Sequence, residues 1–262
     1  MIYVTSDLHG FPLSGFLHLL SLAEFSGKDE LIVLGDVIDR NGDGGIDLLR
    51  WMMVHSNVRL ILGNHEGMML SCSFLLDSIT DQMLAQFDPL RMNLLHTWLA
   101  NGAEPTLETL HAMQQKNPGF VPALLSYVRR APLYEMRRIG NRQFLLTHAG
   151  LGHFDPARPI SAYAPDDLLW NRPSLEDVYF TDIFTVFGHT PTIAYGPEYA
   201  DRMILTPTWA DIDTGASSGR SPMLLRLDDM KPFWFQSVKI TIDITLYYCA
   251  GFARCNRDRI AL

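Results

Sequence analysis

The sequence predicts an α/β protein in which two mixed β-sheets pack face to face and helices cover the outside. Short, unbroken apolar runs at residues 2–5, 31–34 and 58–62 are typical of strands that are buried on both faces. Helical patterns separate these runs, which indicates parallel strands joined by crossover helices. A β-rich second half, which differs in sequence from the first, supplies the second sheet.

The size and charge of the chain limit the classes of protein to which it can belong. Its 262 residues suffice for one large domain or two small ones, and no internal repeat divides them, so we expect one domain over residues 1–262. The hydrophobic content of 47% supports a sizeable core. The net charge of −8 leaves no basic footprint for generic binding to nucleic acid.

Cysteine usage and the apolar segments bear on the cellular setting. Three cysteines without a Cys-x-x-Cys pair predict neither a disulfide framework nor a zinc knuckle, and a reducing, cytoplasmic setting is the simplest interpretation. The first residues are strand-like, so no signal peptide is expected. The apolar segment 240–253 contains Asp243 and is too short and too polar for a membrane span, so no membrane association is expected.

The first half alternates strands and helices. Apolar residues spaced at i, i+3, i+4 and i+7 from Leu13 predict a helix, and Gly27 is its expected stop. The second strand, at 31–34, is followed by a helix at 46–54 and by the third strand at 58–62. Polar residues follow each strand directly, so three loops should meet at one edge of a parallel sheet.

The middle of the chain, at about 67–132, is predicted to be a helical insertion. Four helices are expected, at residues 68–76, 88–99, 105–115 and 120–130. Asp88 followed by Pro89 is a typical start for the second of them. No metal-ligand or nucleophile spacing occurs in this stretch, so the insertion should flank or cover a site built elsewhere.

Strands return at Leu133. Residues 139–142 are a plausible hairpin turn between two strand-like runs. Two apolar runs, at 143–146 and 184–187, end next to His148 and His189. Further strands are expected at 203–205, 223–227 and 233–244, and the last of them opens a C-terminal β extension over about 233–262.

Six metal-ligating side chains follow the predicted strands directly: Asp7, His9, Asp36, Asn64, His148 and His189. Oxygen and imidazole donors without a thiolate suit manganese, iron or zinc. Six donors exceed the three protein ligands of a tetrahedral catalytic zinc, and they fit two ions that share a carboxylate. Asp36, on the central strand, is the expected bridge between the two ions.

Neighbouring residues complete a site for phosphate-ester hydrolysis. Two divalent ions lower the pKa of a shared water, and their excess positive charge attracts an anionic ester. Arg40 and Arg172 are suited to bidentate phosphate contacts. His65, beside Asn64, can protonate the leaving oxygen. Asp39 can accept a hydrogen bond from the other ring nitrogen, which should orient His65 and favour its charged form.

Taken together, these motifs are similar to those of the phosphoprotein phosphatase family of metallophosphoesterases. The resemblance rests on Asp-x-His at 7–9, Gly-Asp-x-x-Asp-Arg at 35–40, Gly-Asn-His-Glu at 63–66 and Gly-His-Thr at 188–190. Trp-Asn-Arg at 170–172 and Ile-Asp-Thr-Gly at 212–215 look most like its compact bacterial and phage branch. The resemblance spans residues 2–227, and the four motifs in this order are more specific than any single one.

The resemblance implies a metallophosphoesterase-type β-sandwich flanked by helices, with two divalent ions, manganese first and iron or zinc as alternatives. Asp7 and His9 would hold the first ion, with Asp36 as the bridge. Asn64, His148 and His189 would hold the second ion.

The same resemblance assigns the remaining roles. Arg40, Arg172 and Asn64 would bind the phosphate, His65 would be the general acid and Asp39 its orienting partner. The family mechanism is direct attack by hydroxide held between the ions. The implied partners are proteins that carry phosphoserine or phosphothreonine, with phosphotyrosine or a small phosphate ester as further substrates.

Two positions depart from the family pattern, which has glycine at both. Ser6 precedes the first aspartate, and Asn41 follows Arg40. Neither residue is an expected ligand. Because asparagine tolerates a left-handed backbone better than most residues, the turn at Asn41 is expected to survive.

Two other functions remain as alternatives. Symmetrical diadenosine tetraphosphatases resemble this chain in size and motif order, but they lack an acid at the position of Asp39 and carry Asp at that of Glu66. A metal-stabilised binding protein on the same fold would have lost a ligand or catalytic position, and all ten candidate residues are present. The oligomeric state, the metal and the physiological substrate leave no signature in the sequence.

Overall fold

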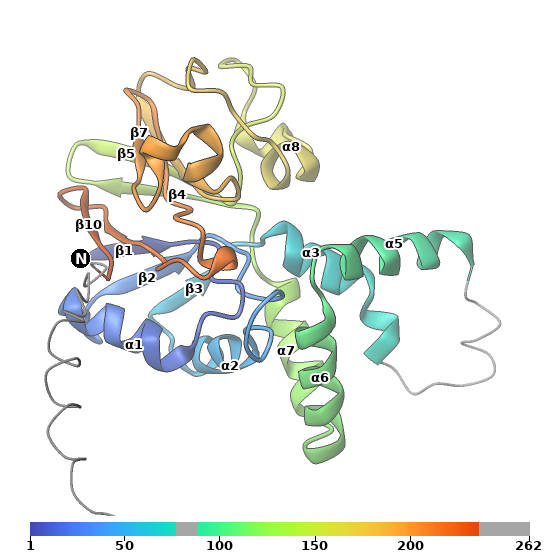
Figure 1. The fold of residues 1–262 in the computed structure, drawn as a ribbon. Helices are drawn as coiled ribbons and strands as arrows, with labels where there is room; N and C mark the ends of the chain where they lie inside the picture. Colours follow the sequence, from blue (N-terminus) through green and yellow to red (C-terminus); the bar gives the residue numbers. More distant parts are fainter. Residues whose placement is uncertain (77–87, 236–262) are drawn as a thin grey trace, which may run out of the picture.

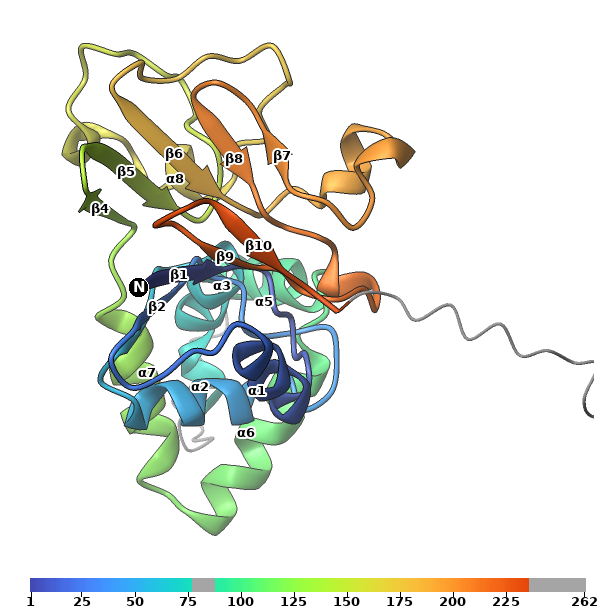
Figure 2. The ribbon, with the colours of Figure 1, turned by 90° about the vertical axis from the view of Figure 1, so that its left-hand side faces the viewer.

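Two five-stranded sheets packed against one another form the centre of the computed structural model, which describes residues 1–76 and 88–235 (Figure 1 and Figure 2). Each sheet contains both parallel and antiparallel pairs, and helices cover the outer faces. The predicted α/β architecture of two mixed sheets is therefore confirmed. Within the described residues, no helix is both long and apolar enough to cross a membrane.

The first sheet has three parallel strands at one side and an antiparallel pair at the other. In spatial order its strands are β10 (Lys231–Phe233), β9 (Leu224–Arg226), β1 (Ile2–Thr5), β2 (Glu30–Val33) and β3 (Val58–Leu60). Side chains alternate between the two faces of this sheet. Val4 and Ile32 face the second sheet, whereas Leu31 and Val33 pack against α1 (Leu13–Leu22) and α2 (Ile46–Val54).

The second sheet places three parallel strands at its centre. In spatial order its strands are β4 (Tyr134–Ile139), β5 (Arg142–Thr147), β6 (Ile183–Phe187), β8 (Trp209–Asp211) and β7 (Ile204–Leu205). The expected hairpin is present, because Ile139 pairs with Arg142 across a two-residue turn. The outer face is covered by the short helix α8 (Pro165–Leu169) and by loops that include 3-10 turns at Ile160–Ala162, Thr192–Tyr195 and Pro197–Tyr199. A further 3-10 turn, Ala216–Ser218, lies between β8 and β9 in the chain.

Helices fill the described part of the chain between β3 and β4. They are α3 (Asn64–Ser71), a 3-10 turn (Ser73–Leu76), α5 (Pro89–Ala100), α6 (Glu104–Lys116) and α7 (Phe120–Arg129). Asp88 caps α5 as expected, since its side chain accepts a hydrogen bond of 2.8 Å from the backbone N–H of Arg91. The last three helices in this group extend away from the sheets (Figure 1).

Three predicted boundaries were wrong. Helix α3 begins at Asn64 rather than at Met68, so the motif 63–66 lies at a helix N-terminus. Helix α1 ends at Leu22, well before Gly27, because Glu24 adopts a left-handed conformation with φ of 57°. Strand β10 ends at Phe233, where the predicted strand was to begin. Most of the predicted C-terminal extension, residues 236–262, lies outside the described residues.

Candidate metal centre

All six predicted ligands meet at one edge of the molecule, where the C-terminal ends of parallel strands from both sheets converge. They follow β1, β2, β3, β5 and β6 directly in the chain. All six are buried, with exposed fractions between 0% and 6%: Asp7, His9, Asp36, Asn64, His148 and His189. The sheet topology therefore accounts for the site, since it carries residues that are distant in sequence to a single point.

His148 lies at the centre of one half of the site. Its Nδ1 donates to the carbonyl oxygen of Leu34 at 2.7 Å, which leaves a lone pair on Nε2 when the ring is neutral. Around this Nε2 lie Asn64 Oδ1 at 2.8 Å, His189 Nδ1 at 3.2 Å and Asp36 Oδ1 at 3.5 Å. His189 Nε2 is buried and has no hydrogen-bond partner among the described residues.

His9 has the same arrangement in the other half. Its Nδ1 lies 3.0 Å from the carbonyl oxygen of Ile38, so its Nε2 carries the lone pair. That Nε2 is 3.6 Å from Asp36 Oδ2 and 3.9 Å from Asp7 Oδ1. A ring nitrogen that donates to a backbone carbonyl while the other points into a cluster of acceptors is typical of metal-ligating histidines.

Asp36 belongs to both halves. Candidate ligand atoms of Asp36, His148 and His189 lie within 4.8 Å of one another, and so do those of His9, Asp36 and His65. One carboxylate oxygen of Asp36 faces each half. This placement agrees with its predicted role as the bridge.

Asp7 is a better candidate than His65 for the metal ligand beside His9, although the group of atoms within 4.8 Å of one another contains His65 and not Asp7. Both ring nitrogens of His65 already take part in hydrogen bonds, to Asp39 and to Arg40. Asp7 Oδ2 accepts from the backbone N–H of His189 at 2.8 Å and from the hydroxyl of Ser6, whereas Oδ1 points toward His9.

The electrostatics of the cluster call for a cation. Burial raises the pKa of Asp36 well above its usual range, and the nearby carboxylates of Asp7 and Glu66 raise it further. Burial lowers the pKa of His9 and of His189 far below the usual value, so both rings are neutral at physiological pH. Lone pairs on unprotonated carboxylates and ring nitrogens repel when they face one another. A bound divalent ion converts this repulsion into coordination, so the residues present fit a metal centre.

His65 and Asp39 form a buried pair beside this cluster. His65 Nδ1 lies 2.6 Å from Asp39 Oδ2, and Nε2 accepts from a guanidinium nitrogen of Arg40 at 3.1 Å. Burial lowers the pKa of His65 to about 2, with a further contribution from Arg40, and burial raises the pKa of Asp39 to about 7. The predicted contact is therefore present. The sequence predicted that it favours the charged form of His65, whereas burial and Arg40 together lower the pKa of the ring.

The helical insertion contributes directly to this pair, which the sequence did not indicate. Trp98 Nε1 donates to Asp39 Oδ2 at 2.8 Å, and Thr106 Oγ1 donates to Asp39 Oδ1 at 2.6 Å. Asn101, between α5 and α6, accepts from Arg40 Nε through its carbonyl oxygen at 3.4 Å. No local pattern could have revealed these contacts, because they join segments about 60 residues apart.

Glu66 was also missed as a functional residue. Its carboxylate accepts hydrogen bonds from four backbone N–H groups of the ligand-bearing loops: Asp36 at 2.8 Å, Val37 at 2.8 Å, Ile38 at 3.3 Å and Gly63 at 3.1 Å. It therefore fixes the loop after β2 against the start of α3. A sequence signal was available, because glutamate at the third helical position is typical of a capping box.

The backbone is strained where the ligands lie. Ten non-glycine residues among those described have a positive φ, and six of them are candidate site residues: Asp7, His9, Asp36, Asp39, Arg40 and His189. Such conformations cost about 1–3 kcal/mol each and persist only where surrounding contacts hold them. Gly63 and Gly188 make room for these loops. A Cβ on Gly63 would lie 2.4 Å from the backbone nitrogen of Asp36, and one on Gly188 would lie 2.2 Å from Asp7 Oδ2.

Asn41, which stands where the family pattern has glycine, does not adopt the left-handed conformation considered from the sequence. Asn41 is not among the described residues with positive φ, and the left-handed positions are Asp39 and Arg40. The Asn41 amide donates to the carbonyl oxygens of His9 at 3.0 Å and Ser217 at 3.2 Å. The asparagine therefore ties the loop after β2 to two other loops, which a glycine at this position could not do.

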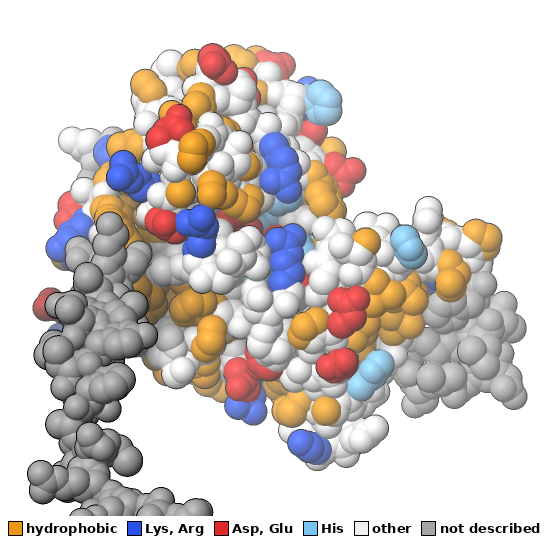
Figure 3. Space-filling model, in the orientation of Figure 1, with side chains coloured by type: hydrophobic (Ala, Val, Ile, Leu, Met, Phe, Trp, Pro, Cys, Tyr) orange, Lys and Arg blue, Asp and Glu red, His pale blue; other side chains and the backbone are white. Residues whose placement is uncertain are grey.

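A pocket of about 190 Å³ opens over the cluster of candidate metal ligands and is lined by His9, Asp36, Asn64 and His189 among them. Its lining includes both predicted phosphate-binding arginines, together with Asn101, Trp170, Pro191 and Asp213. Arg40 and Arg172 are exposed, whereas the ligands beneath them are buried. In Figure 3, basic side chains flank a hollow between the second sheet, at the top, and the helices below it. The pocket thus has a buried acidic and histidine-rich floor and an exposed basic rim.

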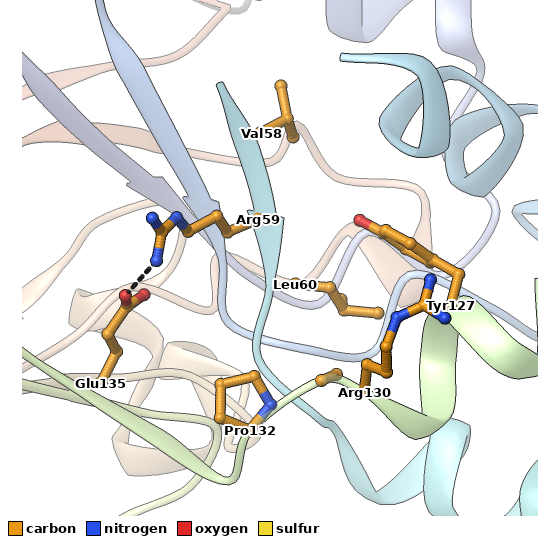
Figure 4. A pocket seen from close by; sticks show the side chains of 8 residues that line it. Val58, Arg59, Leu60, Tyr127, Arg130, Pro132 and Glu135 are labelled. Carbon is orange, nitrogen blue, oxygen red and sulfur yellow. Dashed lines mark hydrogen bonds and ion pairs between the residues drawn. The ribbon is translucent and has the colours of Figure 1, made fainter. Parts of the chain in front are cut away.

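A larger cavity, of about 330 Å³, lies elsewhere and lacks this chemistry (Figure 4). It lies at the edge strand β3 and is lined by Leu60, Tyr127 and Arg130 among others. Arg59 on its rim is already paired with Glu135 at 2.8 Å. Neither paired histidines nor a carboxylate cluster lines this cavity, so its size alone does not make it the functional site.

The fold and the ligand set agree with a match to a known family. The family model described as calcineurin-like phosphoesterase matches residues 1–212, which include every ligand described above. The chain belongs to the calcineurin-like phosphoesterase family. It is therefore a metallophosphoesterase domain, from a family of hydrolases that use two metal ions.

Curated relatives are named symmetrical bis(5′-nucleosyl)-tetraphosphatase. One from Escherichia coli is 30% identical over 151 residues, which cover 57% of this chain and 43% of the relative. One from Chromobacterium violaceum is 38% identical over 74 residues, covering 28% and 26% respectively. The match thus spans less than half of the length of these relatives.

A solved structure supports the fold independently. A crystal structure described as that of a candidate diadenosine tetraphosphatase has a TM-score of 0.59 and 17% sequence identity, and it covers 89% of this chain and 92% of its own. At this level of identity the similarity establishes the fold.

Replacing the bridging carboxylate should disrupt metal binding in both halves of the site. We expect Asp36→Asn to lower the affinity for Mn²⁺ by more than the roughly 10–100-fold that loss of an outer hydrogen-bond partner costs. Calorimetric titration with manganese chloride measures this, with the exposed Asp182→Asn as the control. Two ions bound to Asp36→Asn with unchanged affinity would contradict the assignment.

Removing the charge of Glu66 should loosen the ligand loops. Because its carboxylate accepts four backbone hydrogen bonds, Glu66→Gln should lower the free energy of unfolding by about 1.5–3 kcal/mol. Urea unfolding without added metal measures the loss. The exposed Glu176→Gln should change the stability by less than about 0.5 kcal/mol, and equal effects of the two changes would refute the anchoring role.

Proposed function

We propose that this protein is a metal-dependent phosphomonoesterase of the phosphoprotein phosphatase type that removes phosphate from phosphoserine and phosphothreonine in proteins. The observation that carries the proposal is the Asp39–His65 contact of 2.6 Å at the wall of the metal pocket. An alkoxide such as that of serine is a poor leaving group and needs a proton donor. A buried acid–imidazole pair beside the phosphate position supplies one.

The pocket offers complementary groups for a phosphate monoester. Arg40 and Arg172 extend over the metal cluster from separate loops and would bind the non-bridging oxygens. Asn64, which also lines the pocket, would contact the same group. When bound, two divalent ions, with Mn²⁺ as our first choice, would supply a water of lowered pKa as the nucleophile.

His65 would acquire its proton as the substrate binds. In the structure Arg40 donates to His65 Nε2 and lowers the pKa of that ring. A phosphate dianion would draw the Arg40 guanidinium away and place negative charge beside the ring. Both changes favour the imidazolium form. In this form Nε2–H can donate to the leaving oxygen, while Nδ1–H continues to donate a hydrogen bond to Asp39.

The size of the pocket bears on the kind of substrate that we propose. A pocket of 190 Å³ would hold the phosphate group alone, so the protein or small ester that carries it would remain outside, along the rim. The partners proposed are therefore phosphorylated proteins or small phosphate esters, without nucleic acid or membrane. We propose a cytoplasmic location, in line with the cysteine content.

A second candidate function is hydrolysis of symmetrical dinucleoside tetraphosphates. The names of the curated relatives favour it. Trp170, with 41% of its surface exposed, also lies at the pocket and could stack on a nucleoside base. The acid at position 39 and glutamate at position 66 argue for the phosphatase.

A direct comparison of substrates separates the two candidates. With Mn²⁺ supplied, we expect a phosphoserine peptide to be hydrolysed with a kcat/KM at least about 10-fold above that for diadenosine tetraphosphate, a difference of 1.4 kcal/mol in the barrier. Phosphate release and nucleotide chromatography measure the two rates. The reverse ranking would assign the protein to the second function.

The acid role of His65 can be tested through the leaving group. We expect His65→Ala to lower kcat on a phosphoserine peptide by about 10²–10⁴-fold and to affect 4-nitrophenyl phosphate much less, since nitrophenolate needs little protonation. His153→Ala is the control, because the side chain of His153 is 86% exposed and pairs only with Asp167 among the described contacts. Equal losses on both substrates would exclude His65 as the acid.

A further inference from the structure

Two side chains of the helical insertion complete the surroundings of Asp39. The carboxylate of Asp39 is fully buried and accepts three hydrogen bonds from side chains: His65 and Trp98 on Oδ2, and Thr106 on Oδ1. Trp98 comes from α5 and Thr106 from α6, and both are buried, with exposed fractions of 1% and 0%. Donors on both oxygens fix the plane of the carboxylate and its direction toward His65.

The insertion also holds the strained turn that carries Asp39. Asp39 and Arg40 are consecutive left-handed residues, with φ of 75° and 71°. The backbone N–H of Arg40 donates to the carbonyl oxygen of Gly102 at 2.8 Å, and that of Asp39 lies 3.0 Å from Thr106 Oγ1. Two unfavourable conformations in succession persist because these contacts hold them.

Close packing leaves α6 little freedom to move away. A Cβ on Gly44 would lie 2.4 Å from the Cα of Thr106, so the turn after Arg40 and the start of α6 touch through backbone. Thr106 Oγ1 also lies 3.2 Å from the carbonyl oxygen of Gly44. The backbone contact with Gly44 therefore fixes the position of the short Thr106 side chain relative to the turn that carries Asp39.

We propose that Trp98 and Thr106 are positioning residues for the Asp39–His65 pair, through which the helical insertion sets the rate on substrates with poor leaving groups. This inference rests on the proposed role of His65 as the acid. Neither residue lines the pocket, so each would act through Asp39 and not by contact with the substrate. The chemical step should depend on both residues, and substrate binding should not.

The test uses the manganese-loaded enzyme and two substrates, a phosphoserine peptide and 4-nitrophenyl phosphate. Trp98→Phe and Thr106→Val each remove one donor to Asp39. We expect kcat on the peptide to fall roughly 10–100-fold, the range for loss of a hydrogen bond to a charged group, with KM unchanged and with little effect on the nitrophenyl ester. Thr106→Ser keeps the hydroxyl and should restore most of the rate.

Matched controls separate positioning from general damage to the fold. Thr97→Val makes the same change at an exposed position of α5, and Trp51→Phe makes the same change at a partly buried position on α2. Both should leave the ratio of the two rates unchanged. In an Asp39→Asn background, Trp98→Phe and Thr106→Val should have no further effect on the ratio, because residues that act through one group are not additive.

Each outcome decides a different point. If His65→Ala shows no dependence on the leaving group, the acid assignment fails and the positioning role fails with it. If His65→Ala shows that dependence but Trp98→Phe and Thr106→Val slow both substrates equally or not at all, only the positioning inference is overturned. Should Trp98→Phe fail to fold, the comparison of Thr106→Val with Thr106→Ser decides alone.

Discussion

The structure depends on the cost of burying acceptor atoms that face one another. Asp7, Asp36 and the rings of His9, His148 and His189 direct carboxylate oxygens and ring nitrogens toward a single region. Hydrophobic packing alone would not hold such a set together, because each buried carboxylate disfavours ionisation of the next. A centre of divalent cations would make the arrangement favourable, and hydrogen bonds with the surrounding backbone and with Glu66 fix these side chains and their loops in place.

Strained backbone conformations bring these buried groups together. Left-handed residues turn the chain sharply at the ends of β1, β2 and β6, so that the side chains of nearby residues point toward different parts of the site. The segment 36–40 illustrates the result: Asp36 faces the metal cluster, Asp39 faces His65, and Arg40 reaches the pocket rim. Glu66 offsets the cost of the turn at 36–38 by accepting from three successive N–H groups in addition to that of Gly63. The strained turn and the hydrogen bonds that stabilise it are therefore in direct contact.

The helical insertion belongs to the site as much as the sheets do. The strands determine where the ligands lie, but α5 and α6 determine how the Asp39 carboxylate is oriented. The family relationship covers residues 1–212 and therefore includes the insertion, whereas the curated relatives match only part of the chain. If His65 is the proton donor that we propose, a change in the insertion would alter the orientation of this donor without altering the candidate metal centre, which would let one fold serve esters with different leaving groups.

The sequence by itself predicted the first three strands and the six candidate ligands, because both predictions rest on local features. Unbroken apolar runs mark buried strands, and in a parallel sheet the residues that follow such strands must meet at one edge, so the sequence could place Asp7, Asp36 and Asn64 together. His148 and His189 follow strands of the second sheet, and the packing of the two sheets brings them to that edge. Only the tertiary structure decided what surrounds them. Trp98 and Thr106 reach Asp39 across about 60 residues, and nothing in their own segments indicates it. The neutral state of His65 likewise depends on burial and on the guanidinium of Arg40, and both are properties of the packed chain.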